Sequence, residues 1–178
     1  MADCAFPTSA APVRMAPVQI GLLRLRPARN NDLDFLRGLY RSFRAEEMAT
    51  VPWPQSVKDA FLDQQFRLQH QHFTTVFADA DFLIVERAGS PVGRLYLQSS
   101  AEGVLVVDIG LLPESRRQGY GRLLMAWVIR RASSERAPKV WLHVLPQNTP
   151  ARRLYERLGF VVVGEKEALM RMERLSAS

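Results

Sequence analysis

The chain has 178 residues, 47% of them hydrophobic and 24% charged, and its formal net charge is +6 at pH 7. This composition is typical of a globular protein with one hydrophobic core, and no apolar run reaches the roughly 20 residues that would span a bilayer. With a single cysteine, Cys4, the chain forms neither an internal disulfide nor a cysteine metal site, and its three histidines lack convincing ligand spacing with carboxylates.

The N-terminal segment differs in composition from the rest of the chain. It is rich in Ala and Pro, carries little charge, and is interrupted by Pro7, Pro12 and Pro17, which argues against a secretory signal. We therefore expect residues 1–18 to form a disordered tail and residues 19–178 to form one domain of a cytoplasmic protein. Met15 leaves open whether the natural chain begins there.

The first predicted elements are a strand and a helix. A strand is expected at 20–26. A helix capped by Asn30 or Asn31 should follow, because apolar residues from Leu33 to Phe43 recur at helical spacing. Residues 44–54 are expected to form a loop.

A second helix is expected to begin at Ser56 and to end in solvent near His70 and His72. Alternating apolar residues and the turn Ala-Gly-Ser-Pro then predict a hairpin and a further antiparallel strand. These three strands are expected at 82–87, 92–98 and 102–112.

A glycine-rich turn follows the third of these strands. Residues 113–121 read Pro-Glu-Ser-Arg-Arg-Gln-Gly-Tyr-Gly, and an amphipathic helix is expected over 122–133. Such a turn lets backbone N–H groups approach an anion at the positive end of a helix dipole. No Lys-Ser or Lys-Thr pair follows, as a P-loop requires, and the third glycine of the dinucleotide fingerprint is missing. The turn is therefore predicted to hold the phosphates of another ligand.

A second motif follows a strand expected at 140–145. From Asn148 to Phe160 the chain reads Asn-x-x-Ala-x-x-Leu-Tyr-x-x-x-Gly-Phe. Asn148 is a good N-cap for a helix over 149–158, and Gly159 is suited to end it. Capping alone would account for these two residues, and helix packing alone would account for Tyr155. Two closing strands are expected near 160–164 and 168–174.

Taken together, the Arg-x-x-Gly-x-Gly run at 116–121 and the motif at 148–160 resemble the two motifs of the GNAT superfamily of N-acetyltransferases. The element order over about residues 20–175 is similar as well. The resemblance implies an α/β (α+β) fold, with a mixed, mostly antiparallel sheet of six to seven strands and about four helices. Two splayed strands would hold acetyl-CoA.

The resemblance also implies the donor site and the reaction. The backbone near Ile109, Leu111 and Leu112 would pair with pantetheine, and Asn148 would touch the pantetheine or its phosphate arm. Tyr155 would donate a proton to the leaving thiolate after direct attack by an amine in a ternary complex. The pyrophosphate would be held by the turn and the helix start, at Arg116, Arg117, Gln118, Gly119, Tyr120, Gly121 and Arg122.

The sequence leaves open whether the general base is one of two carboxylates or water. Asp108 and Glu102 are the candidates, and Asp108 stands out because it interrupts an apolar strand. A carboxylate there needs a partner, and such carboxylates often mark functional sites. An arginine or backbone partner with a purely structural role would explain Asp108 equally well.

Charge differs between the two halves of the chain. Residues 116–174 contain 13 Lys or Arg against 5 Asp or Glu, a net charge of +8, whereas residues 1–115 carry −2. The basic half is the half expected to bind CoA phosphates, so the overall charge requires no nucleic acid. The acceptor side, built from the two early helices and a loop at 73–82, is expected to be mildly acidic and to favour a cationic amine. Its acidic residues would be Glu46, Glu47, Asp79 and Asp81.

Several alternatives remain at this level. A small amine, an amino-acid derivative, an antibiotic and a protein N-terminus are all open as acceptors, and Phe43, Trp53 and Phe73 are candidates to line the pocket. A non-catalytic acyl-CoA-binding regulatory module is the second functional reading, and a nucleic-acid-binding protein is a distant third. The resemblance is compatible with a homodimer, and we expect neither a metal nor a membrane partner.

Overall fold

The computed structural model describes residues 5–7 and 15–176. Within these residues the chain forms an eight-stranded sheet with the order β1-β2-β3-β4-β5-β6-β8-β7, together with four α-helices. The expected mixed, mostly antiparallel architecture is confirmed, with one strand more than the six to seven predicted. Cys4 and most of the expected tail, residues 1–4 and 8–14, lie outside the described residues.

The elements have the following bounds. The strands are β1 Val18–Ile20, β2 Leu23–Pro27, β3 Asp81–Arg87, β4 Ser90–Ser100, β5 Gly103–Leu111, β6 Lys139–Val144, β7 Val161–Lys166 and β8 Leu169–Leu175. The helices are α1 Leu33–Ala49, α2 Gln55–Val76, α3 Tyr120–Ser134 and α4 Thr149–Arg157, with short 3-10 turns at Asn30–Asp32 and Pro113–Ser115.

The additional strand comes from the first predicted one. Where a single strand was expected at 20–26, β1 and β2 form an antiparallel hairpin in which Ile20 pairs with Leu23. Gly21 adopts a φ of 58° at the turn, a conformation that glycine reaches without steric cost. The turn places Ile20, Leu23 and Leu25 in the core.

Helix α1 begins differently from the prediction, since neither Asn30 nor Asn31 caps it. A 3-10 turn at Asn30–Asp32 leads directly into α1. The carboxylate of Asp32 accepts hydrogen bonds from the backbone N–H of Arg29 at 2.8 Å and from the guanidinium of Arg26 at 2.7 and 2.8 Å. Asn30 instead accepts a hydrogen bond from the backbone N–H of Phe6.

Both early helices are longer than predicted. Residues 44–49, expected in a loop, are the last part of α1, which buries Met48 and ends just before Pro52 and Pro54. Helix α2 continues to Val76, so the predicted loop at 73–82 begins as helix. His70 is 2% exposed rather than solvated, because its ring stacks on Phe66 and meets the edge of Phe6.

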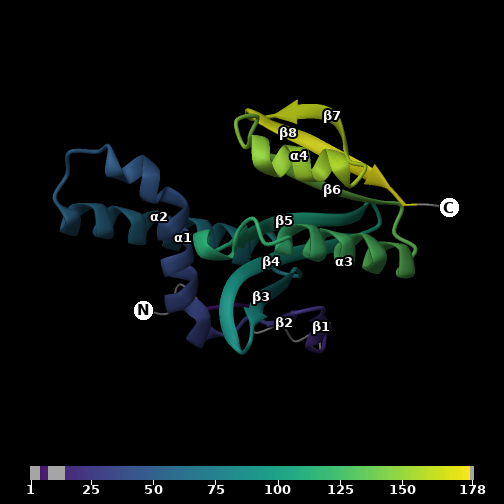
Figure 1. Cartoon of the computed structure of the whole chain (residues 1–178), viewed down its shortest axis with the longest axis horizontal. Helices are drawn as coiled ribbons and strands as arrows, with labels where there is room; N and C mark the ends of the chain where they lie inside the picture. Colours follow the sequence, from purple (N-terminus) through teal and green to yellow (C-terminus); the bar gives the residue numbers. More distant parts are fainter. Residues whose placement is uncertain (1–4, 8–14, 177–178) are drawn as a thin grey trace.

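Two apolar clusters flank the sheet. Helices α3 and α4 bury Leu124, Met125 and Tyr155 together with strand residues from β2 to β6 and β8. Helices α1 and α2 form a second cluster, which includes Ile84 from β3. Figure 1 shows α1 and α2 together at one end of the molecule, and α4 beside β6, β7 and β8 at the other. In the described part of the chain, no helix is long and apolar enough to cross a membrane.

Candidate active site

The centre of the sheet opens between β5 and β6. These two strands run parallel and pair only from Val104 to Val106 with Val140 to Leu142. Beyond this point β5 continues to Leu111 and β6 to Val144 without pairing to each other. A β-bulge contributes to the divergence, because Leu97 pairs with Val106 whereas the adjacent Tyr96 pairs with Asp108. Of the predicted pantetheine-pairing residues, Ile109 and Leu111 therefore lie in the part of β5 that does not pair with β6, and Leu112 directly follows the strand.

The glycine-rich turn lies at the end of this opening, next to the start of α3. Arg117 and Gly119 have positive φ angles of 59° and 80°, and α3 begins at Tyr120, two residues earlier than expected. The first N–H groups of an α-helix have no acceptor within the helix, so the start of α3 presents donors and a positive dipole end. A Cβ built on Gly119 meets nothing within 4 Å. The turn is thus open to a ligand.

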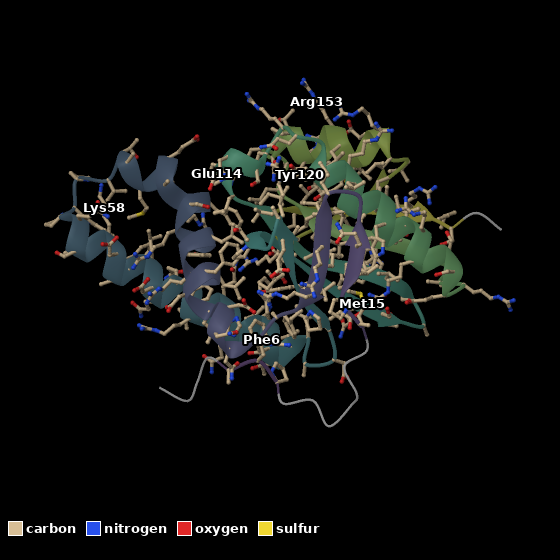
Figure 2. The ribbon with its side chains drawn as sticks, turned by 60° about the horizontal axis from the view of Figure 1, so that its bottom comes forward. Phe6, Met15, Lys58, Glu114, Tyr120 and Arg153 are labelled. Atoms are coloured by element: carbon tan, nitrogen blue, oxygen red, sulfur yellow. The ribbon has the colours of Figure 1, made fainter. Side chains whose placement is uncertain are left out.

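Neighbouring side chains hold the turn in place. Gln118 donates a hydrogen bond to the carbonyl of Glu114 at 2.6 Å and accepts one from Arg87 at 3.4 Å. The guanidinium of Arg87 lies over the ring of Tyr120, which is 6% exposed. Figure 2 shows Glu114 and Tyr120 on the same side of the molecule, away from Lys58 on α2.

Arg116 is exposed, but its side chain and backbone also make contacts within the protein. Its backbone N–H donates to the carbonyl of Pro113, and its Nε donates to the carbonyl of Leu111 at 3.0 Å. Its guanidinium also lies 5.5 Å from the ring centre of Phe43 on α1. The side chains of Arg117 and Arg122 are exposed, as is that of Arg153 on α4.

Helix α4 has the caps that the sequence predicts. The side chain of Asn148 accepts a hydrogen bond from the backbone N–H of Ala151 at 3.3 Å. Gly159 has a φ of 85°, and the N–H of Phe160 returns to the carbonyl of Tyr155. These caps fix the position of Tyr155, which is 6% exposed.

Asn148→Ala should lower the free energy of unfolding by about 1 kcal/mol, because the first turn of α4 loses its acceptor. Chemical denaturation measures this change. Thr149→Ala at the next position, which leaves the cap intact, should change stability by less than about 0.5 kcal/mol. Equal effects of the two substitutions would show that the cap contributes nothing.

Tyr155 on α4 is electrostatically coupled to Asp108 on β5. Burial, and to a smaller extent the negative charge of Asp108, raise the pKa of Tyr155 to about 12. The phenol is therefore protonated at every pH near neutrality. A buried, protonated phenol can donate a hydrogen bond or a proton into the opening.

Of the two candidate bases, only Asp108 lies at the opening. Glu102 is at the β4–β5 turn, before the paired part of β5. Hydrogen bonds from Arg171 and from Lys139 lower the pKa of Glu102. Asp108 pairs with Arg94, whose Nε lies 2.5 Å from Oδ2, so the arginine partner considered in the sequence analysis is present. The sequence analysis missed Arg94, although this residue also interrupts an apolar strand.

The residues expected on the acceptor side lie in different environments. Phe43 packs so closely on β5 that a Cβ on Gly110 would lie 2.4 Å from its ring, and Phe73 packs edge-on against Tyr96. Trp53 is 45% exposed and contacts Phe61 instead. The assignment of Asp81 to the acceptor side is wrong, because Asp81 pairs with Arg131 of α3 at 2.7 Å.

A separate hollow lies between the two early helices. It has a volume of about 470 Å³ and is lined by residues such as Ala45, Met48 and Leu62. None of the residues of the two motifs lines it. Among the described residues there is also no group of three or more His, Cys, Asp or Glu placed to hold a metal ion.

The opening, the glycine-rich turn and Tyr155 form the arrangement expected of an acyl-CoA-dependent transferase. The model of the Acetyltransferase (GNAT) family matches residues 36–160, and the chain therefore belongs to this family.

Relatives of similar sequence include further acetyltransferases. Mycothiol acetyltransferase from Streptomyces griseus is 35% identical over 86 residues, which are 47% of this chain and 28% of that protein. The chain thus spans less than a third of that relative's length. Aminoglycoside N(6′)-acetyltransferase type 1 from Salmonella typhimurium is 27% identical over 139 residues, 76% of this chain and 90% of that protein.

Solved structures show the same fold. The PaiA N-acetyltransferase from Thermoplasma acidophilum, determined in complex with coenzyme A, superposes with a TM-score of 0.66. The match covers 86% of this chain and 98% of that chain at 17% sequence identity. At this identity the similarity establishes the fold, which agrees with the prediction.

Proposed function

We propose that the protein transfers the acetyl group of acetyl-CoA to a primary amine by direct attack in a ternary complex. The observation that carries this proposal is the opening between β5 and β6, with the glycine-rich turn at its end and Tyr155 electrostatically coupled to Asp108. Family membership and the acetyltransferase relatives support the same donor.

The donor would lie along β5 and end at α3. The N–H and C=O groups of β5 beyond Val106 do not pair with β6, and an extended amide chain such as pantetheine can add to such an edge. The pyrophosphate would meet the N–H groups from Arg117 to Arg122 at the start of α3. The side-chain oxygen of Asn148 already accepts a hydrogen bond from the backbone N–H of Ala151. The side-chain NH₂ group of Asn148 would therefore be the donor that contacts the pantetheine arm.

In the chemical step, the neutral amine nitrogen attacks the thioester carbon. The C–N bond forms, the C–S bond breaks, and Tyr155 protonates the leaving sulfur. The nitrogen loses one proton to water and Tyr155 regains one from water, so the products are the acetamide and free CoA thiol. A positioned acid of this kind contributes roughly 100- to 10,000-fold to the rate.

The acceptor is proposed to be a small amine. The aminoglycoside acetyltransferase supports this class because the match extends over 76% of the present chain. We propose as the first panel an aminoglycoside, spermidine, and a free amino acid, each assayed by release of the CoA thiol.

The donor site is tested by Gly119→Glu, which places a carboxylate where the phosphates would lie. Calorimetry should show acetyl-CoA binding to the wild type and a dissociation constant at least about 100-fold higher in the variant. Gly89→Glu is the matched control, because Gly89 has a φ of 81° against 80° for Gly119 and both positions are open within 4 Å. It should change the dissociation constant less than about fivefold.

Each alternative outcome has a definite meaning. Equal loss of binding in both variants would point to backbone strain rather than to phosphate contact. Binding without release of thiol from any amine would support the non-catalytic regulatory module. No binding of acetyl-CoA by the wild type would refute the proposal.

A further inference from the structure

A buried cation lies beneath the α1–α2 layer, outside both sequence motifs. Arg94 is on β4 and is only 2% exposed. Burying a guanidinium is costly unless its charge and its N–H groups are satisfied. The groups that contact Arg94 therefore indicate the role of this residue.

Contacts from four elements fix the orientation of Arg94. Its Nε donates to Oδ2 of Asp108 on β5 at 2.5 Å, and its Nη2 donates to Oε1 of Gln69 on α2 at 2.9 Å. The rings of Phe43 on α1 and of Phe73 and Tyr96 surround the guanidinium at 5.4 to 5.8 Å. The planar group thus has one orientation available.

The exposure of the ion pair is strongly asymmetric. The side chain of Asp108 is 25% exposed, whereas that of Arg94 is 2% exposed. A ligand in the opening can therefore reach the carboxylate but not the guanidinium. Because Arg94 occupies Oδ2, an approaching N–H group would be bound through Oδ1.

We infer that Arg94, held by Gln69, is a positioning residue that fixes Asp108 as the anchor for the protonated nitrogen of a cationic acceptor. The inference rests on the proposed function and narrows it in two ways. It names the acceptor class as a cationic primary amine, and it assigns Asp108 to binding rather than to proton removal. The ammonium proton then leaves to water before the nitrogen attacks.

The placement of this anchor fits the reaction. Asp108 lies just beyond Val106, in the part of β5 that no longer pairs with β6. An amine held by Asp108 would therefore approach the thioester from the β5 side of the opening. A carboxylate engaged by a guanidinium remains ionised, and its second oxygen can still accept a hydrogen bond from a cationic donor.

The test compares a cationic with a neutral nucleophile. Steady-state kinetics would be measured with spermidine, or with the aminoglycoside if only that amine is turned over, and with hydroxylamine after subtraction of the uncatalysed reaction. In Arg94→Met, kcat/KM for the cationic amine should fall about 10- to 100-fold, the usual effect of losing a hydrogen bond to a charged group. Turnover of hydroxylamine and the dissociation constant of acetyl-CoA should change less than about threefold.

Further variants separate positioning from folding. Arg94→Lys should restore part of the lost kcat/KM, since it keeps the charge but not the planar contact with Gln69. Gln69→Leu should produce an intermediate loss. Arg26→Met is the matched control, because Arg26 is likewise paired with carboxylates, Asp32 and Glu86, on the same face of the sheet but two strands away from Arg94. Arg26→Met should leave kcat/KM for the cationic amine and the turnover of hydroxylamine unchanged.

The outcomes distinguish this inference from the proposed function. Unchanged kinetics in Arg94→Met and Gln69→Leu, or equal losses for both nucleophiles, would overturn the anchor while acetyl transfer stands. Wild-type protein that turns over no amine would refute the proposed function and the inference with it.

Discussion

Tyr155→Phe should lower kcat by roughly 100- to 10,000-fold, because the leaving thiolate loses its proton donor. The phenyl ring keeps the packing of Tyr155 against Phe160, so the dissociation constant of acetyl-CoA should change little. Calorimetry and single-turnover thiol release measure the two effects separately. Tyr40→Phe, which removes the hydroxyl of another buried tyrosine in α1, is the control and should retain full activity. A kcat within threefold of wild type in Tyr155→Phe would exclude the acid role.

The pH dependence follows from the pKa of Tyr155. Burial and Asp108 raise it from the ordinary value of 10.0 to about 12 in the folded protein. The folded state therefore holds this proton more tightly than the unfolded state. The associated stabilisation is present below about pH 10 and is lost as the pH rises towards 12. Burial raises the pKa of Tyr96 as well, so absorbance titration should show more than one late-titrating tyrosine, of which one is missing in Tyr155→Phe.

Asp108→Ala should lower the free energy of unfolding by roughly 3 kcal/mol, because it leaves the guanidinium of Arg94 buried without its counter-charge. Combining Arg94→Met with Asp108→Leu should be less destabilising than Asp108→Ala alone, since no unpaired charge remains. Denaturant unfolding of the three proteins measures the difference.

An exposed ion pair provides the control for this experiment. Asp34 pairs with Arg37 in α1, and the side chain of Asp34 is 90% exposed. Asp34→Ala should therefore change stability by no more than about 1 kcal/mol. A comparably small effect of Asp108→Ala would mean that water reaches Arg94 and that the pair is not a buried one.

These two predictions concern the two sides of one site. Tyr155 comes from α4 in the cluster beneath α3, whereas Arg94 and its aromatic neighbours belong to the α1–α2 side of the sheet. The proposed reaction places the thioester and the amine between them, where β5 and β6 separate. Loss of Tyr155 should therefore affect transfer to every nucleophile, whereas loss of Arg94 should affect cationic acceptors selectively.

Local chemistry was sufficient to predict the backbone features that make up the proposed donor site. The glycine-rich turn, the cap at Asn148 and the helix end at Gly159 depend on residues within a few positions of one another, and all three occur as predicted. Positive φ angles and side-chain caps are properties of short segments. The family resemblance rested on these same segments, which explains why fold and family could be inferred from the sequence.

The acceptor half depended on contacts that no local pattern contains. The sequence placed Asp108 in an apolar strand but could not choose its partner, and Arg94, 14 positions earlier, became that partner only through the pairing of β4 with β5. Asp81 was likewise expected on the acceptor side, but in the folded protein it pairs with Arg131 of α3. Ion pairs and helix lengths of this kind are decided by which surfaces are buried together, and burial is a property of the tertiary structure.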